Sequence, residues 1–463
     1  MKEVIIKDGV LEKYNGTATS FTIPDGVTTI GDAAFYGCKS LTSVTFGDNS
    51  QLTTIGDSAF GLCTSLTKID IPTTTTTIDY RAFDGCKSLT SVTFGDNSQL
   101  TTIGHEAFYG CDSLTEIEIP ATVTAIGQRA FYHCTSLISV TFDDNSQLAT
   151  IGDSAFDGCK SLTSVTFGDN SQLATIGEYA FYNCASLRNI TIPNTVTTIG
   201  KWAFADCDSL TSIEIPDSVT TIDYRAFDGC YRLTYNVYDN GKYLGNESNP
   251  YLVLVEETST SITLCEINEN CKVICDSAFR DCESLTSIVI PDGVTTIDSQ
   301  AFENCTSLTS ITVDEDNPNY QSIDGNLYSK DGKTLIQYAI GKTDTLFEIP
   351  DGVTTIGYVA FYDCDSLTNI EIPDSVTTIG IGAFARSTSL TSVTIGNGVT
   401  TIGIGAFGHC TSLTSIVIPD SVTTIGEDAF DDDGHLTIKG YAGSCAETYA
   451  KKSGIPFDEI EGR

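Results

Sequence analysis

The sequence predicts an α/β repeat protein, a solenoid with a parallel β-sheet on one face and short helical turns on the other. An Ala-Phe dipeptide recurs along the chain, and most of its steps are 23 or 25 residues long. Each step repeats one apolar pattern. A single unit cannot cover its own apolar face, but stacked copies bury a continuous core. The phenylalanines of the repeat occupy positions 35, 60, 83, 108, 131, 156, 181, 204, 227, 279, 302, 361, 384, 407 and 430.

One unit, residues 210–230, shows every element of the repeat. It begins Leu-Thr-Ser-Ile-Glu-Ile, and this alternation predicts a strand with one buried face. The Pro-Asp pair that follows predicts a turn, because proline fixes its own φ and has no amide hydrogen. The next stretch, Val-Thr-Thr-Ile, predicts a second extended contact. Ala226, Phe227 and Cys230 then predict a short helical turn, because residues at this spacing share one inward face.

The two step lengths differ at one place in the unit. In the longer step, GDNSQ stands between Phe46 and Leu52, where the shorter step has only PDG between Ile23 and Val27. An insertion confined to one corner predicts that this corner faces solvent in every copy.

Thirteen of the 15 repeat phenylalanines have a cysteine three residues later, and Ser387 and Asp433 fill the other two places. Side chains stacked in register lie about 4.8 Å apart with parallel Cβ vectors, which is poor geometry for a disulfide. We therefore expect a column of buried free thiols. Cys265, Cys271 and Cys275 lie outside the column. Buried thiols are favoured for them too, with a local disulfide or a metal site as alternatives.

The segments LTSVTF, IPDSVTTIG and AFYDC of this repeat resemble the BspA-type leucine-rich repeat family. The resemblance covers essentially the whole chain. It implies a curved leucine-rich-repeat solenoid from a bacterial or protozoan surface protein, in a family associated with adhesion to host matrix proteins or to other cells. It supplies no catalytic residues, and no motif fixes the ligand-binding positions.

The repeat predicts three domains. Residues 1–23 form an N-terminal cap, residues 24–439 the solenoid, and residues 440–463 a C-terminal cap. Expanded coils are expected at about 235–278 and 313–347. We interpret them as β-extensions within the stack, and ligand-contacting projections are the alternative.

The C-terminal cap is expected to contain a short helix. Ser444 and Glu447 form a capping box, and Gly454 fits a helix stop. The last four residues, Ile-Glu-Gly-Arg, spell a factor Xa recognition site, which is consistent with a cloning remnant.

The charge balance narrows the possible partners. The chain has 24 Lys and Arg against 61 Asp and Glu, a formal net charge of −37, which disfavours nucleic acid and anionic membrane surfaces. No apolar run approaches the ~20 residues of a membrane span, and no signal-like segment follows the first residue. We expect an extracellular or cell-surface monomer whose signal and anchor are not present in this chain. Its partner would be a protein or glycan, from host matrix or another cell.

The sequence predicts no enzyme, cofactor or metal site. There is no phosphate-binding glycine loop and no nucleophile elbow. His133 and His409 occupy the same repeat position but lie some ten coils apart, so both are interpreted as surface residues. The acidic runs at 143–144 and 431–433 fit solvated turns better than a calcium loop.

The outward strand positions remain as the candidate binding surface. They carry small hydroxyls and scattered acids, so each contact should be weak and many contacts would be needed. The candidate ligand-binding residues are Asp70, Glu116, Glu118, Thr141, Thr166, Thr191, Glu214 and Glu371.

The function expected from this surface is non-enzymatic adhesion, or protein or glycan binding, through the sheet face and lateral loops. A structural spacer that presents another domain is the alternative. A catalytic solenoid of the polysaccharide-lyase type is disfavoured because basic residues on the sheet face are too sparse. Ice binding is disfavoured because acidic residues interrupt the rows of Ser-x-Thr.

Overall fold

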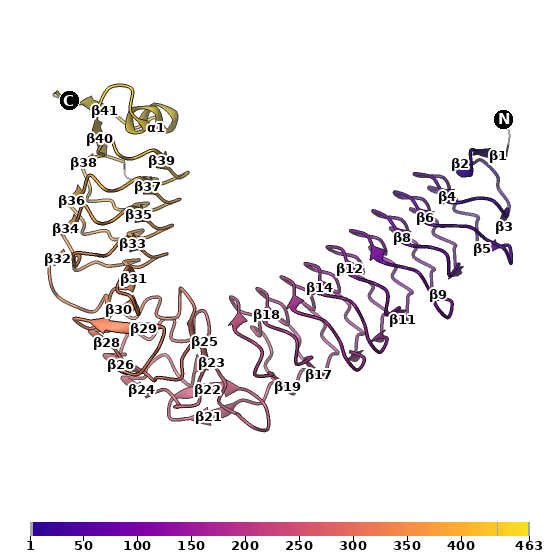
Figure 1. Ribbon diagram of the computed structural model, residues 1–463, viewed down its shortest axis with the longest axis horizontal. Coiled ribbons are helices and arrows are strands. Elements are labelled where there is room, and N and C mark those ends of the chain that lie inside the picture. The colour runs from indigo at the N-terminus through magenta and orange to yellow at the C-terminus, as the bar shows by residue number, and fades with distance from the viewer. Residues whose placement is uncertain (1–2, 433, 462–463) are drawn as a thin grey trace. The chain divides into compact units, whose positions relative to one another are not determined.

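The computed structural model describes residues 3–432 and 434–461, and the chain folds as stacked coils (Figure 1). Asp433 of the repeat and the last two residues lie outside the described part. The chain divides into two compact units. Unit 1 comprises residues 1–235 and 244–250, and unit 2 comprises residues 236–243 and 251–463.

In unit 1 the first strand of each coil forms a parallel sheet with one buried face, as predicted. Ile117 of β11 is buried, for example, and its neighbours Glu116 and Glu118 are exposed. Seven strands form one sheet: β3 (Ser20–Ile23), β5 (Ser43–Phe46), β7 (Lys68–Ile71), β9 (Ser91–Phe94), β11 (Glu116–Ile119), β13 (Ser139–Phe142) and β15 (Ser164–Thr166). A separate pair follows, β17 (Asn189–Thr191) and β19 (Ser212–Glu214).

The Val-Thr-Thr-Ile stretch of each coil forms a second parallel ladder of two-residue strands, which extend an N-terminal hairpin into an eleven-stranded sheet. Its strands are β1 (Val4–Lys7), β2 (Val10–Tyr14), β4 (Thr29–Ile30), β6 (Thr54–Ile55), β8 (Thr77–Ile78), β10 (Thr102–Ile103), β12 (Ala125–Ile126), β14 (Thr150–Ile151), β16 (Thr175–Ile176), β18 (Thr198–Ile199) and β20 (Thr221–Ile222).

Unit 2 has the same two kinds of ladder. The first kind comprises β24 (Leu264–Glu266), β26 (Ser287–Ile290) and β28 (Ser310–Val313), then β32 (Leu346–Glu348), β34 (Asn369–Ile372) and β36 (Ser392–Ile395), then β38 (Ser415–Val417), β40 (Thr437–Gly440) and β41 (Phe457–Glu459). The second kind comprises β25 (Val273–Ile274) and β27 (Thr296–Ile297), and further along β33 (Thr355–Ile356), β35 (Thr378–Ile379), β37 (Thr401–Ile402) and β39 (Thr424–Ile425).

Both expansions of the repeat add strands to unit 2. The first contains β21 (Asn236–Tyr238), β22 (Gly241–Leu244) and β23 (Val253–Glu257), and β23 joins the coil ladder by pairing with β25. The second contains β29 (Tyr320–Ile323), β30 (Asn326–Ser329) and β31 (Thr334–Gln337), and β31 pairs with β33.

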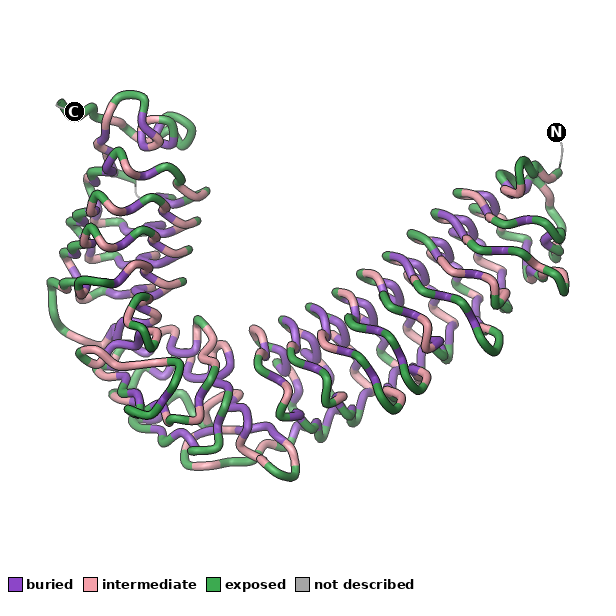
Figure 2. The backbone as a smooth tube through the Cα atoms, in the orientation of Figure 1, coloured by how far each residue is buried: buried purple, intermediate pink, exposed green. Residues whose placement is uncertain are grey.

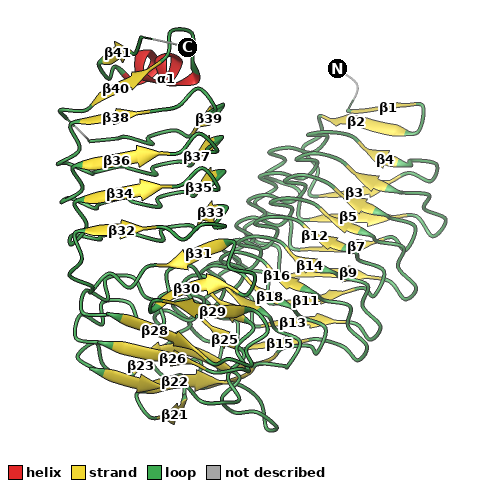
Figure 3. Ribbon diagram, turned by 60° about the vertical axis from the view of Figure 1, so that its left-hand side comes forward, coloured by secondary structure: helices red, strands yellow, loops and turns green. Residues whose placement is uncertain are grey.

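The Ala-Phe segments do not form the short helical turns that the sequence predicted, and loops and turns fill this part of each coil (Figure 3). The backbone amides of this segment donate alternately within the turn and to the next coil. Ala34 N donates to Gly31 O inside the turn (3.1 Å), but Phe35 N donates to Ala59 O of the next coil (2.7 Å). Ala33 has φ 51° and Gly37 has φ 71°. Positive φ is incompatible with a right-handed helix, so the segment is a series of tight turns bonded across coils.

The inward side chains of these turns are the ones that the sequence predicted. Ala226, Phe227 and Cys230 are all buried. Consecutive phenylalanine rings stack, with 5.2 Å between the ring centroids of Phe108 and Phe131. Figure 2 shows the buried residues along the inside of the coils.

All 17 cysteines are free. Most thiols of the column donate to the carbonyl of the phenylalanine one coil earlier, as Cys134 Sγ does to Phe108 O (3.2 Å). Ser387 makes the same bond to Phe361 O (2.9 Å), which explains why serine can replace cysteine there.

Two elements lie at the ends of the stack, and we propose them as its caps. Tyr14 of the β1–β2 hairpin stacks on Phe35, with 5.1 Å between ring centroids. At the other end, α1 (Cys445–Ser453) begins after Ser444, whose side chain accepts from Glu447 N, and ends at Gly454 with φ 70°. The start and stop of this helix confirm the sequence prediction.

Candidate ligand-binding face

Most of the eight candidate residues lie on the sheet face of unit 1, on exposed strand positions. Pairing places Glu118 beside Thr141 and Thr141 beside Thr166 in one row across β11, β13 and β15. Thr191 and Glu214 are paired in the next sheet. Glu371 lies in unit 2 and pairs with Glu348, so it does not join the others.

The ladder of this face is complete only at some junctions, and in unit 1 the number of paired residues follows coil length. Where a short coil is followed by a long one, four residues of one strand pair with four of the next. This holds between β3 and β5, β7 and β9, and β11 and β13. A long coil followed by a short one keeps two pairs between β5 and β7 and one between β9 and β11. Between β15 and β17 the sheet ends and another begins.

We attribute this difference to the two-residue insertion, which lengthens the corner after the strand of a long coil. The register itself is kept, but pairing stops early in the strand of the following short coil. At the β9–β11 junction only Ser91 pairs with Glu116, and the two strands then separate. Thr122 ties the two corners together, because its hydroxyl donates to Ser98 O (3.1 Å) and Leu100 O (2.7 Å).

This separation opens a hollow of about 640 Å³ between β9 and β11, which we call the sheet-face hollow. It brings together three candidates, Glu116, Glu118 and Thr141. The structure adds residues that the sequence analysis missed, chiefly Asp96 and Asp143. Remaining polar residues of its lining are Ser91, Thr93, Asn97, Ser98, Thr122 and Ser139.

The charge of the sheet-face hollow is one-sided. Four carboxylates line it, from Asp96, Glu116, Glu118 and Asp143, and its lining holds no Lys or Arg. None of the ion pairs recorded for residues 3–432 and 434–461 uses any of these four groups. The hollow therefore favours a ligand that brings cations or hydrogen-bond donors.

Asp70 is already engaged within the face. Thr93 Oγ1 donates to its carboxylate (2.6 Å) and Lys68 Nζ lies 3.1 Å from it. The Thr93 hydrogen bond, together with Lys68, lowers the pKa of Asp70. Asp70 is therefore a weaker candidate than the acids of the hollow.

Two other candidates, Thr191 and Glu214, line a second hollow of about 560 Å³ on the same face. Asn246 and Ser248, from the loop of the first expansion that belongs to unit 1, also line it. Asn246 Nδ2 donates to Asp217 Oδ1 (2.9 Å), which fixes this loop against the sheet corner. Thr166 lines neither hollow.

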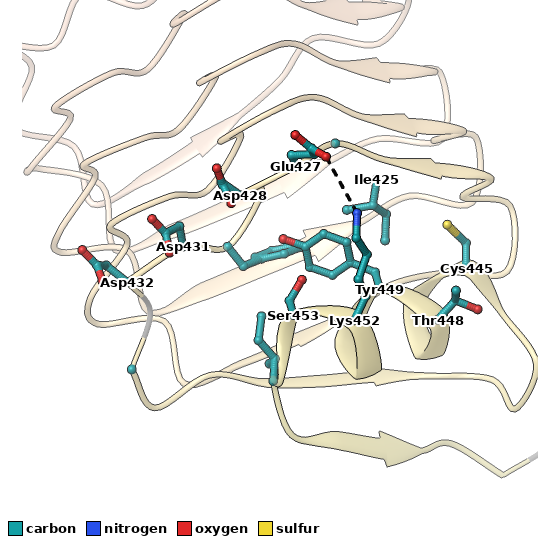
Figure 4. A pocket seen from close by; sticks show the side chains of 14 residues that line it. Ile425, Glu427, Asp428, Asp431, Asp432, Cys445, Thr448, Tyr449, Lys452 and Ser453 are labelled. Atoms are coloured by element: carbon teal, nitrogen blue, oxygen red, sulfur yellow. Dashed lines mark ion pairs between the residues drawn. The ribbon is translucent and has the colours of Figure 1, made fainter.

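A further cavity of about 790 Å³ lies between the last coil and α1 (Figure 4). Lys452 of the helix faces Glu427 of the coil across it, with Nζ and Oε1 3.8 Å apart. Tyr449 packs edge-on against Phe430 at 5.9 Å between ring centroids. These contacts hold the helix on the last coil, so we assign the cavity to the C-terminal end of the stack rather than to ligand binding.

One group of possible metal ligands occurs among the described residues, His409 with Asp431 and Asp432. His409 Nδ1 lies 3.3 Å from Asp432 Oδ2. All three residues are exposed, as the sequence analysis expected of His409 and of the acidic run. Exposed ligands hold a metal weakly because water competes for each of them, so the group supports no metal site.

Comparison with known families decides the identity of the repeat. The profile described as "BspA type Leucine rich repeat region (6 copies)" matches residues 5–138, 101–234, 257–343 and 337–440. The chain belongs to the BspA-type leucine-rich repeat family. BspA-type proteins are leucine-rich-repeat scaffolds of bacterial surfaces that are generally not enzymes, and the family suggests a role in protein binding or adhesion.

Several solved structures resemble this BspA-type chain. A leucine rich cell surface protein from Faecalibacterium prausnitzii is 27% identical, with 99% of this chain and 93% of that one covered and a TM-score of 0.38. A leucine-rich repeat protein from Bacteroides ovatus is 25% identical, with 100% and 99% covered and a TM-score of 0.41. A leucine-rich repeat protein from T. pallidum is 30% identical, with 38% of this chain and 82% of that one covered and a TM-score of 0.35.

A search of curated proteins finds no match. The family membership therefore rests on the repeat profile. Within the described part of the chain, no helix combines the length and the apolar character that crossing a membrane requires.

Proposed function

We propose that this BspA-type chain is a non-enzymatic adhesion protein of the cell surface and that it binds a protein partner through the sheet face of unit 1. The sheet-face hollow is its main contact. The observation that supports this proposal most directly is the gathering of Asp96, Glu116, Glu118 and Asp143 around one opening that no Lys or Arg lines.

The chemistry of the hollow defines the partner. Exposed carboxylates recognise Lys and Arg side chains, and hydroxyls such as that of Thr141 can accept or donate further hydrogen bonds. Anionic ligands are repelled, both locally and by the net charge of −37. A partner surface with clustered Lys and Arg therefore fits best, and its binding should weaken with added salt.

Replacing two carboxylates of the hollow tests this proposal. In the double variant Glu116→Gln, Glu118→Gln the side chains keep their shape and lose their charge. The wild-type chain and the variant are titrated over immobilised fibronectin, laminin and collagen and over a glycan array. We expect saturable binding to at least one protein surface and a loss of about tenfold or more in the variant.

The matched control is the double variant Glu12→Gln, Glu283→Gln, which removes the same charge from exposed residues outside the hollow. It should bind as the wild type does. Unchanged binding by the Glu116→Gln, Glu118→Gln variant would contradict the proposed site. Binding to glycans alone would replace the protein partner with a glycan. If the chain bound no surface saturably, the adhesion role would be contradicted. The structural spacer would then be the remaining function.

A further inference from the structure

A second surface, on the turn side of unit 2, differs from the rest of the molecule. In each coil the residue three positions before the repeat phenylalanine faces outward. In unit 2 three consecutive coils place Tyr358, Ile381 and Ile404 there, with exposed fractions of 41%, 48% and 51%. In unit 1 most of these positions are polar or charged. They are Asp32, Asp57, Tyr80, His105, Gln128, Asp153, Glu178, Lys201 and Tyr224.

Beside this apolar column the surface is hollowed by small residues. Gly382, Ala385, Gly405 and Gly408 line a hollow of about 360 Å³ together with Ile381 and Ile404, and we call it the turn-face groove. A Cβ on Gly405 would meet no atom within 4 Å, so any side chain there would project into open space.

The groove exists because large side chains are missing from it. The position of Gly405, two residues before the repeat phenylalanine, holds Arg81, Tyr179 and Trp202 in other coils. The backbone is the same in each case, since Gly405 has φ 58° and Trp202 has φ 54°. The hollow thus depends on residue choice and not on a different course of the chain.

The aromatic end of the groove is held in place by hydrogen bonds. Gln300 Nε2 donates to the hydroxyl of Tyr358 (2.9 Å), and Arg386 Nη1 donates to the hydroxyl of Tyr362 (3.3 Å). Rings fixed in this way form a preorganised wall, so a ligand would lose less entropy in ordering them.

The opposite end is acidic. Asp428 and Asp431 line it and both are exposed. Neither takes part in any ion pair recorded for the described residues, and no Lys or Arg lines the groove. A ligand seated on the isoleucines would therefore meet two available carboxylates next to an apolar floor.

We propose that the turn-face groove is a docking site for a peptide segment of a partner protein that carries a large apolar side chain next to Lys or Arg. The apolar side chain covers Ile381 and Ile404, which gives the association its hydrophobic contribution. The cation lies against Asp428 and Asp431. This site lies in unit 2, whereas the sheet-face hollow lies in unit 1, so the chain would carry two separate binding sites.

The variant Gly405→Trp tests the proposal by filling the groove. Trp202 shows that the backbone of this turn accepts tryptophan at φ 54°. The matched control is Ala33→Trp, which places the same side chain at the equivalent position of a unit 1 coil, where φ is 51°. Thermal unfolding should show that both variants fold.

The probe is an array of immobilised synthetic dodecapeptides that vary in apolar, basic and acidic content. The labelled chain is applied with EDTA, so that metal bound near His409 cannot contribute. We expect retention on peptides with a large apolar residue beside Lys or Arg. Gly405→Trp should weaken it at least tenfold, and Ala33→Trp should leave it unchanged. Asp428→Asn with Asp431→Asn should weaken it by a smaller factor.

Three results would overturn the proposal. The first is that the Gly405→Trp variant is retained on the peptides as strongly as the wild type. The second is that the chain is retained only on acidic or purely polar peptides. The third is that it is retained on no peptide. If Gly405→Trp fails to fold, the double variant Ile381→Ser, Ile404→Ser replaces it, because both side chains are about half exposed (48% and 51%) and contribute little to the core. The same tenfold loss is then required.

Discussion

Side chains that face inward were the part of each coil that the sequence could predict. Ala226, Phe227 and Cys230 are buried because their apolar character recurs at a fixed step. The backbone that presents them could not be predicted. Positive φ is usually indicated by glycine or asparagine, but Arg81 and Trp202 adopt it here. Hydrogen bonds to the next coil offset the strain, and these bonds exist only in the assembled stack.

The buried thiols give a prediction at this scale. Desolvation raises the pKa of Cys63 and of Cys134 to about 12, so few of these groups ionise at pH 8. In the native protein we expect Ellman's reagent to react only with the half-buried Cys38 and Cys445. In guanidinium chloride without reductant all 17 cysteines should react. A native count close to 17, or a denatured count of a few, would contradict the buried free-thiol column.

Asp157 gives a second prediction at the residue scale. Burial raises its pKa to about 6, against opposing effects of Ser154 and Arg129. The unfolded pKa is about 3.9. The native state therefore binds the proton more tightly, and the resulting stability is present below about pH 4 and is lost as the pH rises through about 6.

Asp157→Asn should remove this loss. We expect its Tm to exceed that of the wild type by about 2 °C at pH 7.5, and the difference to shrink as the pH is lowered to 5. Differential scanning calorimetry measures the difference, with Asp48→Asn as a control that removes the same charge from an exposed residue. A difference that grows at pH 5 would refute the raised pKa.

At the scale of the element, coil length is visible in the sequence, but its effect on the ladder is not. The sequence shows GDNSQ after β9 and only Pro-Ala-Thr after β11. It predicts a solvent-facing corner for both. How far the strands stay paired depends on how two adjacent corners meet, and this requires the assembled structure. The candidates Glu116 and Glu118 were found from their strand positions, whereas Asp96 and Asp143 become neighbours only through the hollow.

Shortening one corner tests the role of coil length. Replacing residues 95–99 with Pro-Asp-Gly converts the β9 coil to the short form found at residues 24–26. The β9–β11 ladder should then be complete, and the sheet-face hollow should close. We expect slower hydrogen exchange in β11 and at least tenfold weaker binding of the protein partner. The same replacement at residues 168–172, after β15, removes none of the residues that line the hollow and should leave β11 unchanged. Unaltered exchange in β11 of the first variant would show that coil length does not open the ladder.

At the scale of the whole molecule, repetition makes the architecture predictable. A pattern matched more than a dozen times predicts stacking more strongly than any single segment could. The division into two units was not predicted, because the segment around residues 235–250 was interpreted as one longer coil. In the structure its residues are shared between the units, with 244–250 in unit 1 and 251 onward in unit 2.

The net charge gives a prediction for the whole chain. With 61 acidic and 24 basic residues the folded state experiences self-repulsion, which salt screens. Raising NaCl from about 20 to 500 mM should raise Tm by several degrees, and choline chloride should act equally if screening is the cause. A Tm that stays constant or falls in both salts would contradict the expected repulsion.

We infer that in unit 1 a long coil followed by a short one interrupts the sheet and creates the candidate binding site. Hydrogen exchange of the wild-type chain, followed at the level of single amides, tests it most directly. Faster exchange is expected for strand amides that face the β5–β7, β9–β11 and β15–β17 junctions than for strand amides that bond across the complete β3–β5, β7–β9 and β11–β13 junctions. Equal protection of the two sets of amides would contradict the claim.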